Sequence, residues 1–269
     1  MSASRPDRPA KLLAGCGLSV LLLTLACCLT CRRPEPGDAR AELAPRRPNS
    51  AATAVPRGPE SEWLIADWPQ RHEELVETAR RGSIDLLFLG DSITAAWATT
   101  GAAVWQRHYG ALRAAYFGIG GDQTEHVLWR VQHGELEGIA PEVIVLLIGT
   151  NNLYSNTPAE IAEGIGAILK EIRRRSPRSH VLLMGILPRG RSIGAPERAA
   201  IRAVNEIISG YADDMVTYLD IGPHLVDPDG NLRPDLMLDS VHPSEAGYEV
   251  WARAIEPFLS QHLSAWPEP

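Results

Sequence analysis

The stretch Pro141–Asn152, PEVIVLLIGTNN, places an unbroken apolar run, Val143–Ile148, directly before a glycine and three polar residues. A run of this length bounded by a turn signal predicts a buried β-strand. Strands that are apolar on both faces are typical of parallel sheets covered by helices on both sides. We therefore predict a central parallel strand here, with a polar turn at its carboxyl end.

Short apolar runs alternate with amphipathic segments throughout residues 63–269, which we interpret as one domain without internal repeats. Strands are predicted at Ile84–Leu89, Ala114–Phe117, Val143–Ile148, Val181–Leu187 and Val216–Leu219, and helices at Asp67–Arg81, Gly101–Tyr109, Gln123–His133, Pro158–Arg175, Pro196–Tyr211 and Ser244–His262. This alternation predicts an α/β fold, specifically a flavodoxin-like three-layer sandwich with a five-stranded parallel sheet in the order 2-1-3-4-5.

Polar clusters follow the first three predicted strands, and a fourth cluster precedes the last predicted helix. These clusters are Gly90-Asp91-Ser92, Gly118–Asp122, Gly149–Asn152 and Asp239–Pro243. In an open α/β sheet the functional crevice lies beyond the carboxyl ends of the strands. We therefore expect the first three clusters to share one edge of the sheet, which the fourth reaches if the last loop folds over it.

The residue types in these clusters match the needs of acyl transfer, which are a nucleophile, a base, a group that orients the base, and donors for an oxyanion. Ser92 follows a sharp strand-to-helix turn and is the candidate nucleophile. His242 is the candidate base, and Asp239 is close enough in sequence to orient it. The backbone N–H groups of Ser92 and Gly121 and the amide of Asn151 are the candidate oxyanion donors.

Each residue also has a simpler interpretation. Ser92 alone is more often a helix cap, a single glycine-rich turn is weak evidence for a phosphate site, and Asn151 is a common turn residue. Asp239 and His242 alone could be ordinary loop residues. The combination in one predicted crevice favours catalysis. For His126, Trp129 and Arg130 we favour helix packing, with Arg130 in a structural ion pair, over a role in the pocket wall.

The first 31 residues form a separate segment. Basic residues precede an uncharged stretch, Leu12–Thr30, and Arg32 and Arg33 follow it. This pattern predicts a signal peptide, a lipoprotein signal with Cys27 or Cys28 as the lipidated residue, or a membrane anchor. All three interpretations place the protein outside the cytoplasm, either membrane-anchored, periplasmic or extracellular. Residues 32–62 are rich in Pro, Ala and Arg, and we predict a disordered linker there.

Composition excludes several classes of function. The formal net charge is −7, and because residues 1–50 carry eight Lys/Arg and four Asp/Glu, the remainder carries −11. An acidic body without a basic stripe does not favour nucleic acid as a partner. All four cysteines lie within the first 31 residues, and no histidines elsewhere show metal-ligand spacing. We predict no metal and no cofactor.

The four clusters resemble the blocks of the SGNH (GDSL-like) hydrolase family, with Ser92, Gly121, Asn151 and His242 in the places of Ser, Gly, Asn and His. The stretch FGIGGDQTEHVLWRVQHGELEGIAPEVIVLLIGTNN is also similar to the catalytic subunits of platelet-activating-factor acetylhydrolase Ib, as is GILPRG. The resemblance implies a metal-free serine esterase that uses Ser92, Asp239 and His242. It also implies a small acyl pocket near Ile93, Thr150 and Val241.

Three features depart from that subgroup: Tyr116 replaces the usual Asn, DSVHP is closer to bacterial members, and those intracellular subunits lack an export segment. We therefore carry over the reaction class but not the lipid substrate. The leading hypothesis is hydrolysis of small, acetyl-like esters of a carbohydrate or lipid, with a small-molecule or polysaccharide ester as substrate. The alternatives are a lysophospholipase or thioesterase acting on longer acyl chains, and an inactive binding module tethered to the membrane. The oligomeric state is not predicted.

Overall fold

The computed structural model describes residues 48–58 and 67–267. The segment predicted as a signal, lipoprotein or anchor sequence lies outside these described residues, as does most of the predicted linker. Within them, no helix is both long and apolar enough to cross a membrane.

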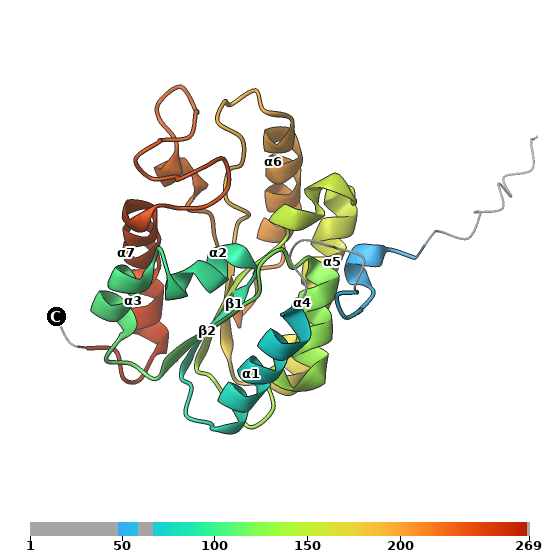
Figure 1. Ribbon diagram of the computed structural model, residues 1–269, viewed down its shortest axis with the longest axis vertical. Coiled ribbons are helices and arrows are strands. Elements are labelled where there is room, and N and C mark those ends of the chain that lie inside the picture. Colours follow the sequence, from blue (N-terminus) through green and yellow to red (C-terminus); the bar gives the residue numbers. More distant parts are fainter. Residues whose placement is uncertain (1–47, 59–66, 268–269) are drawn as a thin grey trace, which may run out of the picture. The chain divides into compact units, whose positions relative to one another are not determined.

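Five parallel strands form a single sheet in the order β2-β1-β3-β4-β5, which confirms the predicted fold class and strand order (Figure 1). The strands are β1 (Leu86–Gly90), β2 (Ala114–Gly118), β3 (Val143–Leu147), β4 (His180–Met184) and β5 (Val216–Leu219). The helices are α1 (Trp68–Arg80), α2 (Ser92–Ala95), α3 (Ala102–Tyr109), α4 (Thr124–Arg130), α5 (Pro158–Arg175), α6 (Pro196–Ser209) and α7 (Glu245–His262).

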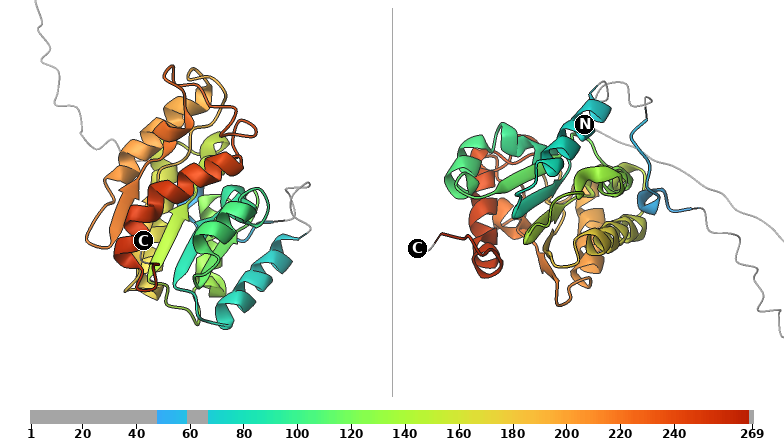
Figure 2. Two further views of the ribbon diagram at one scale, coloured as in Figure 1. Left: turned by 90° about the vertical axis from the view of Figure 1, so that its left-hand side faces the viewer. Right: turned by 90° about the horizontal axis from the view of Figure 1, so that it is seen from below.

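Helices cover both faces of the sheet, as Figures 1 and 2 show. Alternate residues of β1 point to opposite faces, so that Leu87 and Leu89 pack with α1, α4, α5 and α6, while Leu86 and Phe88 pack with α3 and α7. Every residue of β1 and β3 is buried. Burial on both faces explains why these strands read as continuous apolar runs.

Two differences from the predicted elements have local causes. Residues 181–187 were expected to form one strand, but β4 ends at Met184, because the N–H and the carbonyl oxygen of Ile186 bond to the side chain of Asn205 instead of to a neighbouring strand. The helix expected over residues 123–133 is shorter, because α4 passes into a π-type turn, Val131–Glu135, that ends the helix. Gly134 has a φ of 108° in this turn, a conformation that favours glycine.

Residues 48–58, here called the N-terminal strap, pack against the domain although we expected them to be part of a disordered linker. Ala51 is fully buried, and its carbonyl oxygen accepts a hydrogen bond from Thr124 Oγ1 at 2.8 Å. Asn49 Nδ2 donates to the carbonyl oxygen of Glu160 at 2.9 Å, and a Cβ on Gly164 would lie 2.4 Å from the Ala51 oxygen. Polar anchors and close backbone contact therefore order the strap with little apolar burial.

Candidate active site

Two glycines allow α2 to sit directly on the carboxyl edge of the sheet. Gly90 ends β1 and Gly118 ends β2, and the two are paired in register. A Cβ on Gly118 would lie 2.2 Å from the backbone nitrogen of Ala95, and a Cβ on Gly90 would lie 2.2 Å from the carbonyl oxygen of Leu147. A side chain at either position would therefore push α2 or β3 away and displace the residues that follow β1.

Ser92 is the first residue of α2 and lies beside the histidine predicted as its base. Asp91 is the N-cap, and its side chain accepts a hydrogen bond from the N–H of Ile93 at 3.0 Å. The half-buried Ser92 places its Oγ 2.9 Å from Nε2 of His242. The fold thus brings together two side chains that are 150 positions apart in the sequence.

Asp239 holds His242 on its other side. The Oδ2 of Asp239 lies 2.9 Å from Nδ1 of His242, while its Oδ1 accepts hydrogen bonds from the N–H groups of Val241 at 2.6 Å and His242 at 2.8 Å. Burial alone would raise the pKa of Asp239, but these hydrogen bonds outweigh it and lower the pKa. A carboxylate beside Nδ1 favours the tautomer with its proton on Nδ1, which leaves Nε2 free to accept from Ser92.

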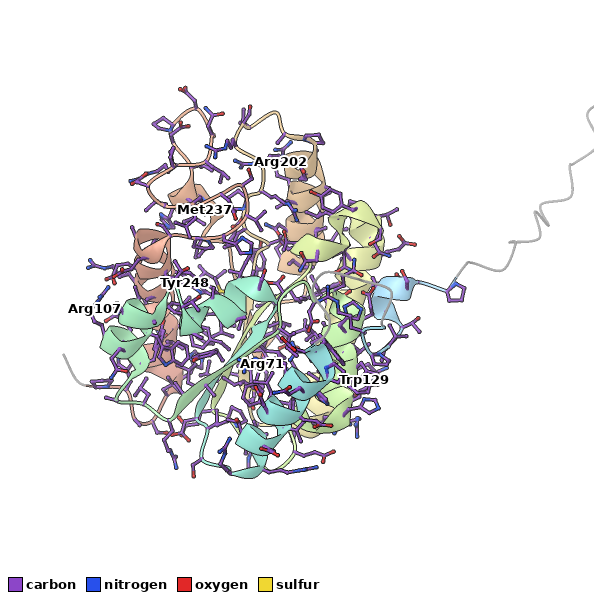
Figure 3. The ribbon with its side chains drawn as sticks, viewed as in Figure 1. Arg71, Arg107, Trp129, Arg202, Met237 and Tyr248 are labelled. Atoms are coloured by element: carbon purple, nitrogen blue, oxygen red, sulfur yellow. The ribbon has the colours of Figure 1, made fainter. Side chains whose placement is uncertain are left out.

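The loop that carries Asp239 and His242 is closed at its base. Met237 pairs with Pro243 in an antiparallel bridge, and the N–H of Leu238 donates to the carbonyl oxygen of His242 at 2.9 Å. Tyr248 of α7 then donates its hydroxyl to the carbonyl oxygen of Ile93 at 2.6 Å, which ties α7 to α2. Figure 3 labels Met237 on this loop and Tyr248 on α7.

The predicted oxyanion donors lie on the turns that follow β1, β2 and β3. Among the described residues, the N–H of Gly121 has no hydrogen-bond partner. Ser92 opens α2, so its N–H has no acceptor within the helix. Asn151 Nδ2 donates to the carbonyl oxygen of Asp122 at 2.8 Å and lies 3.4 Å from Oδ2 of Asp91.

A buried charge network supports this edge of the sheet. Arg130 is fully buried, and it donates from Nε to Asp122 at 2.7 Å and from Nη2 to the carbonyl oxygen of Gly90 at 2.8 Å. Arg130 also pairs with Glu135, which lies 3.0 Å from Nδ1 of His72. The structural ion pair expected for Arg130 is therefore confirmed.

Two buried carboxyl groups of this region have raised pKa values. Burial raises the pKa of Asp91 to about 7. Burial also raises the pKa of Asp122 to about 6, although Arg130 and the indole N–H of Trp68 act in the opposite direction. Raised carboxyl pKa values in a crevice are typical of functional sites.

The three residues predicted to form an acyl pocket do not share one environment. Ile93 and Thr150 are buried, whereas Val241 is partly exposed. Ile93 and Thr150 line a crevice together with Asp91 and Ile186, and this crevice has no room for a water molecule. The described structure thus offers no open pocket around Ile93 and Thr150.

Sequence reasoning missed Arg57, a strap residue that reaches the site. Its Nη1 donates a hydrogen bond to the carbonyl oxygen of Gly120 and lies 4.0 Å from Oδ1 of Asp122. The residue lay in a stretch assigned to the linker for lack of apolar residues. Only its single basic side chain between Pro56 and Gly58 marks it in the sequence.

The arrangement can activate a serine hydroxyl and receive its proton without a metal. The described residues contain no group of three or more His, Cys, Asp or Glu that could hold a metal ion. Ser92 hydrogen-bonds to His242, and His242 hydrogen-bonds to Asp239. The backbone N–H groups of Ser92 and Gly121 lie on the turns next to them. Such a site belongs to the class of serine-dependent acyl hydrolases.

Comparison with known proteins agrees with this class. Residues 88–250 match the model of the GDSL-like Lipase/Acylhydrolase family. The chain is 35% identical over 222 residues to the rat platelet-activating factor acetylhydrolase IB subunit alpha2, covering 82% of this chain and 95% of that protein. The human alpha1 subunit is 34% identical over 199 residues, covering 73% and 84%. The chain therefore belongs to the GDSL-like lipase/acylhydrolase family and is a hydrolase.

Solved structures share the fold at lower identity. A GDSL-like lipase from Bacteroides thetaiotaomicron superposes with a TM-score of 0.54 at 19% identity, covering 73% of this chain and 97% of that chain. A catalytic mutant of an acetylxylan esterase from Geobacillus stearothermophilus gives a TM-score of 0.53 at 19% identity, covering 68% and 96%. At these identities the likeness shows the fold alone.

Proposed function

We propose that the protein is a serine esterase that removes small, acetyl-like acyl groups from a carbohydrate or lipid, with Ser92, His242 and Asp239 as the catalytic triad. The observation that carries the proposal is the chain of two hydrogen bonds, each 2.9 Å long, from Ser92 Oγ to His242 and from His242 to Asp239. The N–H of Gly121, which has no hydrogen-bond partner among the described residues, provides a donor for a developing oxyanion.

In the proposed mechanism Ser92 Oγ attacks the ester carbonyl carbon while His242 Nε2 takes the hydroxyl proton. The carbonyl oxygen becomes an oxyanion, which accepts hydrogen bonds from the N–H groups of Ser92 and Gly121. Asn151 Nδ2 donates to it as well when the oxyanion replaces Asp91, whose Oδ2 lies 3.4 Å from this nitrogen. Collapse breaks the bond to the leaving alcohol, and His242 returns the proton to that alcohol. Water, activated by His242, then hydrolyses the acyl-enzyme and frees Ser92.

Asp239 stays ionised during this cycle. Its pKa is lowered by hydrogen bonds that outweigh the effect of burial, so it remains a carboxylate at neutral pH. A carboxylate beside Nδ1 stabilises the imidazolium that forms when Nε2 takes the proton.

The surroundings of Ser92 favour a small acyl group and a large leaving group. The crevice lined by buried Ile93 and Thr150 has no room for a water molecule, so a long acyl chain has no internal channel there. On the outer side Ser92 and His242 are half-buried and Asp239 is exposed, so that side is open to a bulky alcohol. The name of an acetylhydrolase subunit that is 35% identical to this chain supports an acetyl-like substrate.

We further propose that the protein is exported, and is either released or tethered to a membrane through residues 1–31. The uncharged stretch Leu12–Thr30 between basic flanks supports this localisation. Mass spectrometry of the mature N-terminus distinguishes cleavage, lipidation at Cys27 or Cys28, and retention. An unmodified N-terminus beginning at Met1 on protein recovered from the cytoplasm would contradict export.

The acyl-length profile tests the proposed specificity. With p-nitrophenyl esters from C2 to C16, kcat/KM is expected to be greatest at C2 and to fall steeply beyond C4. Ser92→Ala, assayed beside it, is expected to lose activity by about 10⁴-fold or more. A maximum at C12–C16 would favour the lysophospholipase or thioesterase alternative, and inactivity of the unaltered protein would favour a binding module.

A further inference from the structure

The strap residue Arg57 carries an inference that rests on the proposed function and extends it. The strap reaches the site from outside the sheet, held by the contacts of Asn49 and Ala51 described above and by the N–H of Val55, which donates to the carbonyl oxygen of Glu125 at 3.4 Å. Its last described residues bring the Arg57 guanidinium over the turn that follows β2. The side chain is only 8% exposed.

Arg57 contacts the peptide unit that contains the candidate oxyanion donor. Its Nη1 hydrogen-bonds the carbonyl oxygen of Gly120, and a Cβ on Gly121 would lie 2.6 Å from its Nη2. Gly121 has a φ of 77°, so its lack of a side chain serves both the turn and the close approach of the guanidinium. On the same turn, a Cβ on Gly120 would lie 4.0 Å from Cβ of Ser92.

The geometry of a peptide bond links these observations. The carbonyl of Gly120 and the N–H of Gly121 belong to one planar trans unit and point in opposite directions. A donor that holds the oxygen therefore fixes the direction of the N–H. A hydrogen bond from a cation also polarises the unit and makes its N–H a stronger donor.

We propose that Arg57 is a positioning residue of the oxyanion hole, holding the Gly120–Gly121 peptide so that the Gly121 N–H faces the reacting carbonyl oxygen. A direct role in binding substrate is less compatible with its burial. Because the oxyanion forms only after attack by Ser92, the contribution of Arg57 is greater in the transition state than in the bound substrate.

Steady-state kinetics of the full-length protein test this role. R57M is expected to lower kcat for p-nitrophenyl acetate by about tenfold with KM changed less than about twofold, a smaller loss than removal of an entire oxyanion donor. R57K is expected to recover part of kcat, because an ammonium group donates to one acceptor but lacks the planar guanidinium. The rate of labelling by a fluorophosphonate is expected to fall in parallel with kcat/KM, because the phosphoryl oxygen occupies the same hole.

R71M is the matched control. Arg71 pairs with Glu74 on the surface of α1 (Figure 3), so this variant is expected to leave kcat unchanged. If S92A is inactive but folded R57M keeps kcat within twofold of the parent, the inference fails and the proposed function stands. If S92A stays active, both fail. Should R57M not fold, R57A decides, because it also removes the donor to the Gly120 carbonyl oxygen: a lower kcat at constant KM supports the role, and an unchanged kcat overturns it.

Discussion

Ser92 and Gly121 lie directly beyond the carboxyl ends of β1 and β2, whereas His242 and Asp239 lie on a partly exposed loop before α7. The first half of the site is positioned by β1 and β2, by glycines that admit no side chain, and by the buried Arg130 network. The second half is positioned by short-range hydrogen bonds within residues 237–243 and by Tyr248. The comparison suggests that changes in the buried half affect stability most, and changes in the loop affect catalysis most.

The largest expected effect falls on the loop half. Asp239→Asn keeps an oxygen for the N–H groups of Val241 and His242 but presents an amide N–H toward Nδ1, which favours the wrong imidazole tautomer. We expect kcat to fall by about 10³-fold, somewhat less than for a fully buried triad aspartate. The free energy of unfolding should change by less than about 0.5 kcal/mol, as is usual at exposed positions.

Asp235→Asn provides the control, because Asp235 is exposed on the same segment and pairs with Arg233 rather than with His242. Its kcat is expected to equal that of the parent. A kcat within threefold of the parent for Asp239→Asn would show that the loop does not orient the base as described.

The buried half should instead affect how the free energy of unfolding depends on pH. Burial raises the pKa of Asp91 from its ordinary value of 3.8 to about 7, so the folded protein retains a proton that the unfolded chain has lost between these pH values. The free energy of unfolding therefore falls as pH rises through this window, by up to about 1.4 kcal/mol for each pH unit.

Asp91→Asn removes this titration and retains an acceptor for the Ile93 N–H. Thermal unfolding at pH 5 and pH 8 should show the variant gaining stability relative to the parent at the higher pH. An equal difference at both pH values would mean that Asp91 is not a raised-pKa group. Asp122 is present in both proteins, so its own titration affects the comparison little.

A smaller effect is expected from adding one methyl group at the sheet edge. Gly118→Ala places a Cβ against the Ala95 nitrogen, and overpacking of this kind costs about 1–3 kcal/mol. For a domain of this size the melting temperature should fall by roughly 2–10 °C.

Gly166→Ala is the matched control, since the nearest atoms to its Cβ belong to Tyr211 at 3.6 Å or more. In the interior of α5 this change should stabilise the protein by about 0.5–1 kcal/mol. An unchanged melting temperature for Gly118→Ala would contradict the close packing of α2 on β2.

The sequence predicts the buried half better than the rest of the molecule. Apolar runs that end next to Gly90, Gly118 and Gly149 identify the first three strands and the clusters that follow them, most strongly for β1 and β3, because burial on both faces leaves a strong pattern. The strand order follows from the doubly wound fold class that this alternation predicts. The start of the last helix, predicted at Ser244, also agrees, because Ser244 is the N-cap of α7 and accepts a hydrogen bond from the N–H of Gly247.

Contacts between distant polar side chains leave no such pattern. The strap was missed because it is ordered by hydrogen bonds and by one arginine, and neither periodicity nor apolar content marks such a segment. The pairing of His72 with Glu135 and of Trp68 with Asp122 was likewise not predicted, since each depends on how α1 packs against the sheet. The early end of β4 was not predicted for the same reason, since it depends on the distant side chain of Asn205.

The most direct test of the central claim is to identify the residue that reacts with a fluorophosphonate. After labelling and tryptic digestion, the account predicts a single adduct in the peptide Gly82–Arg107, localised to Ser92 by fragmentation, and no adduct in His242→Ala under the same conditions. A stoichiometric adduct on any other serine, or full labelling of His242→Ala at the parent rate, would contradict it.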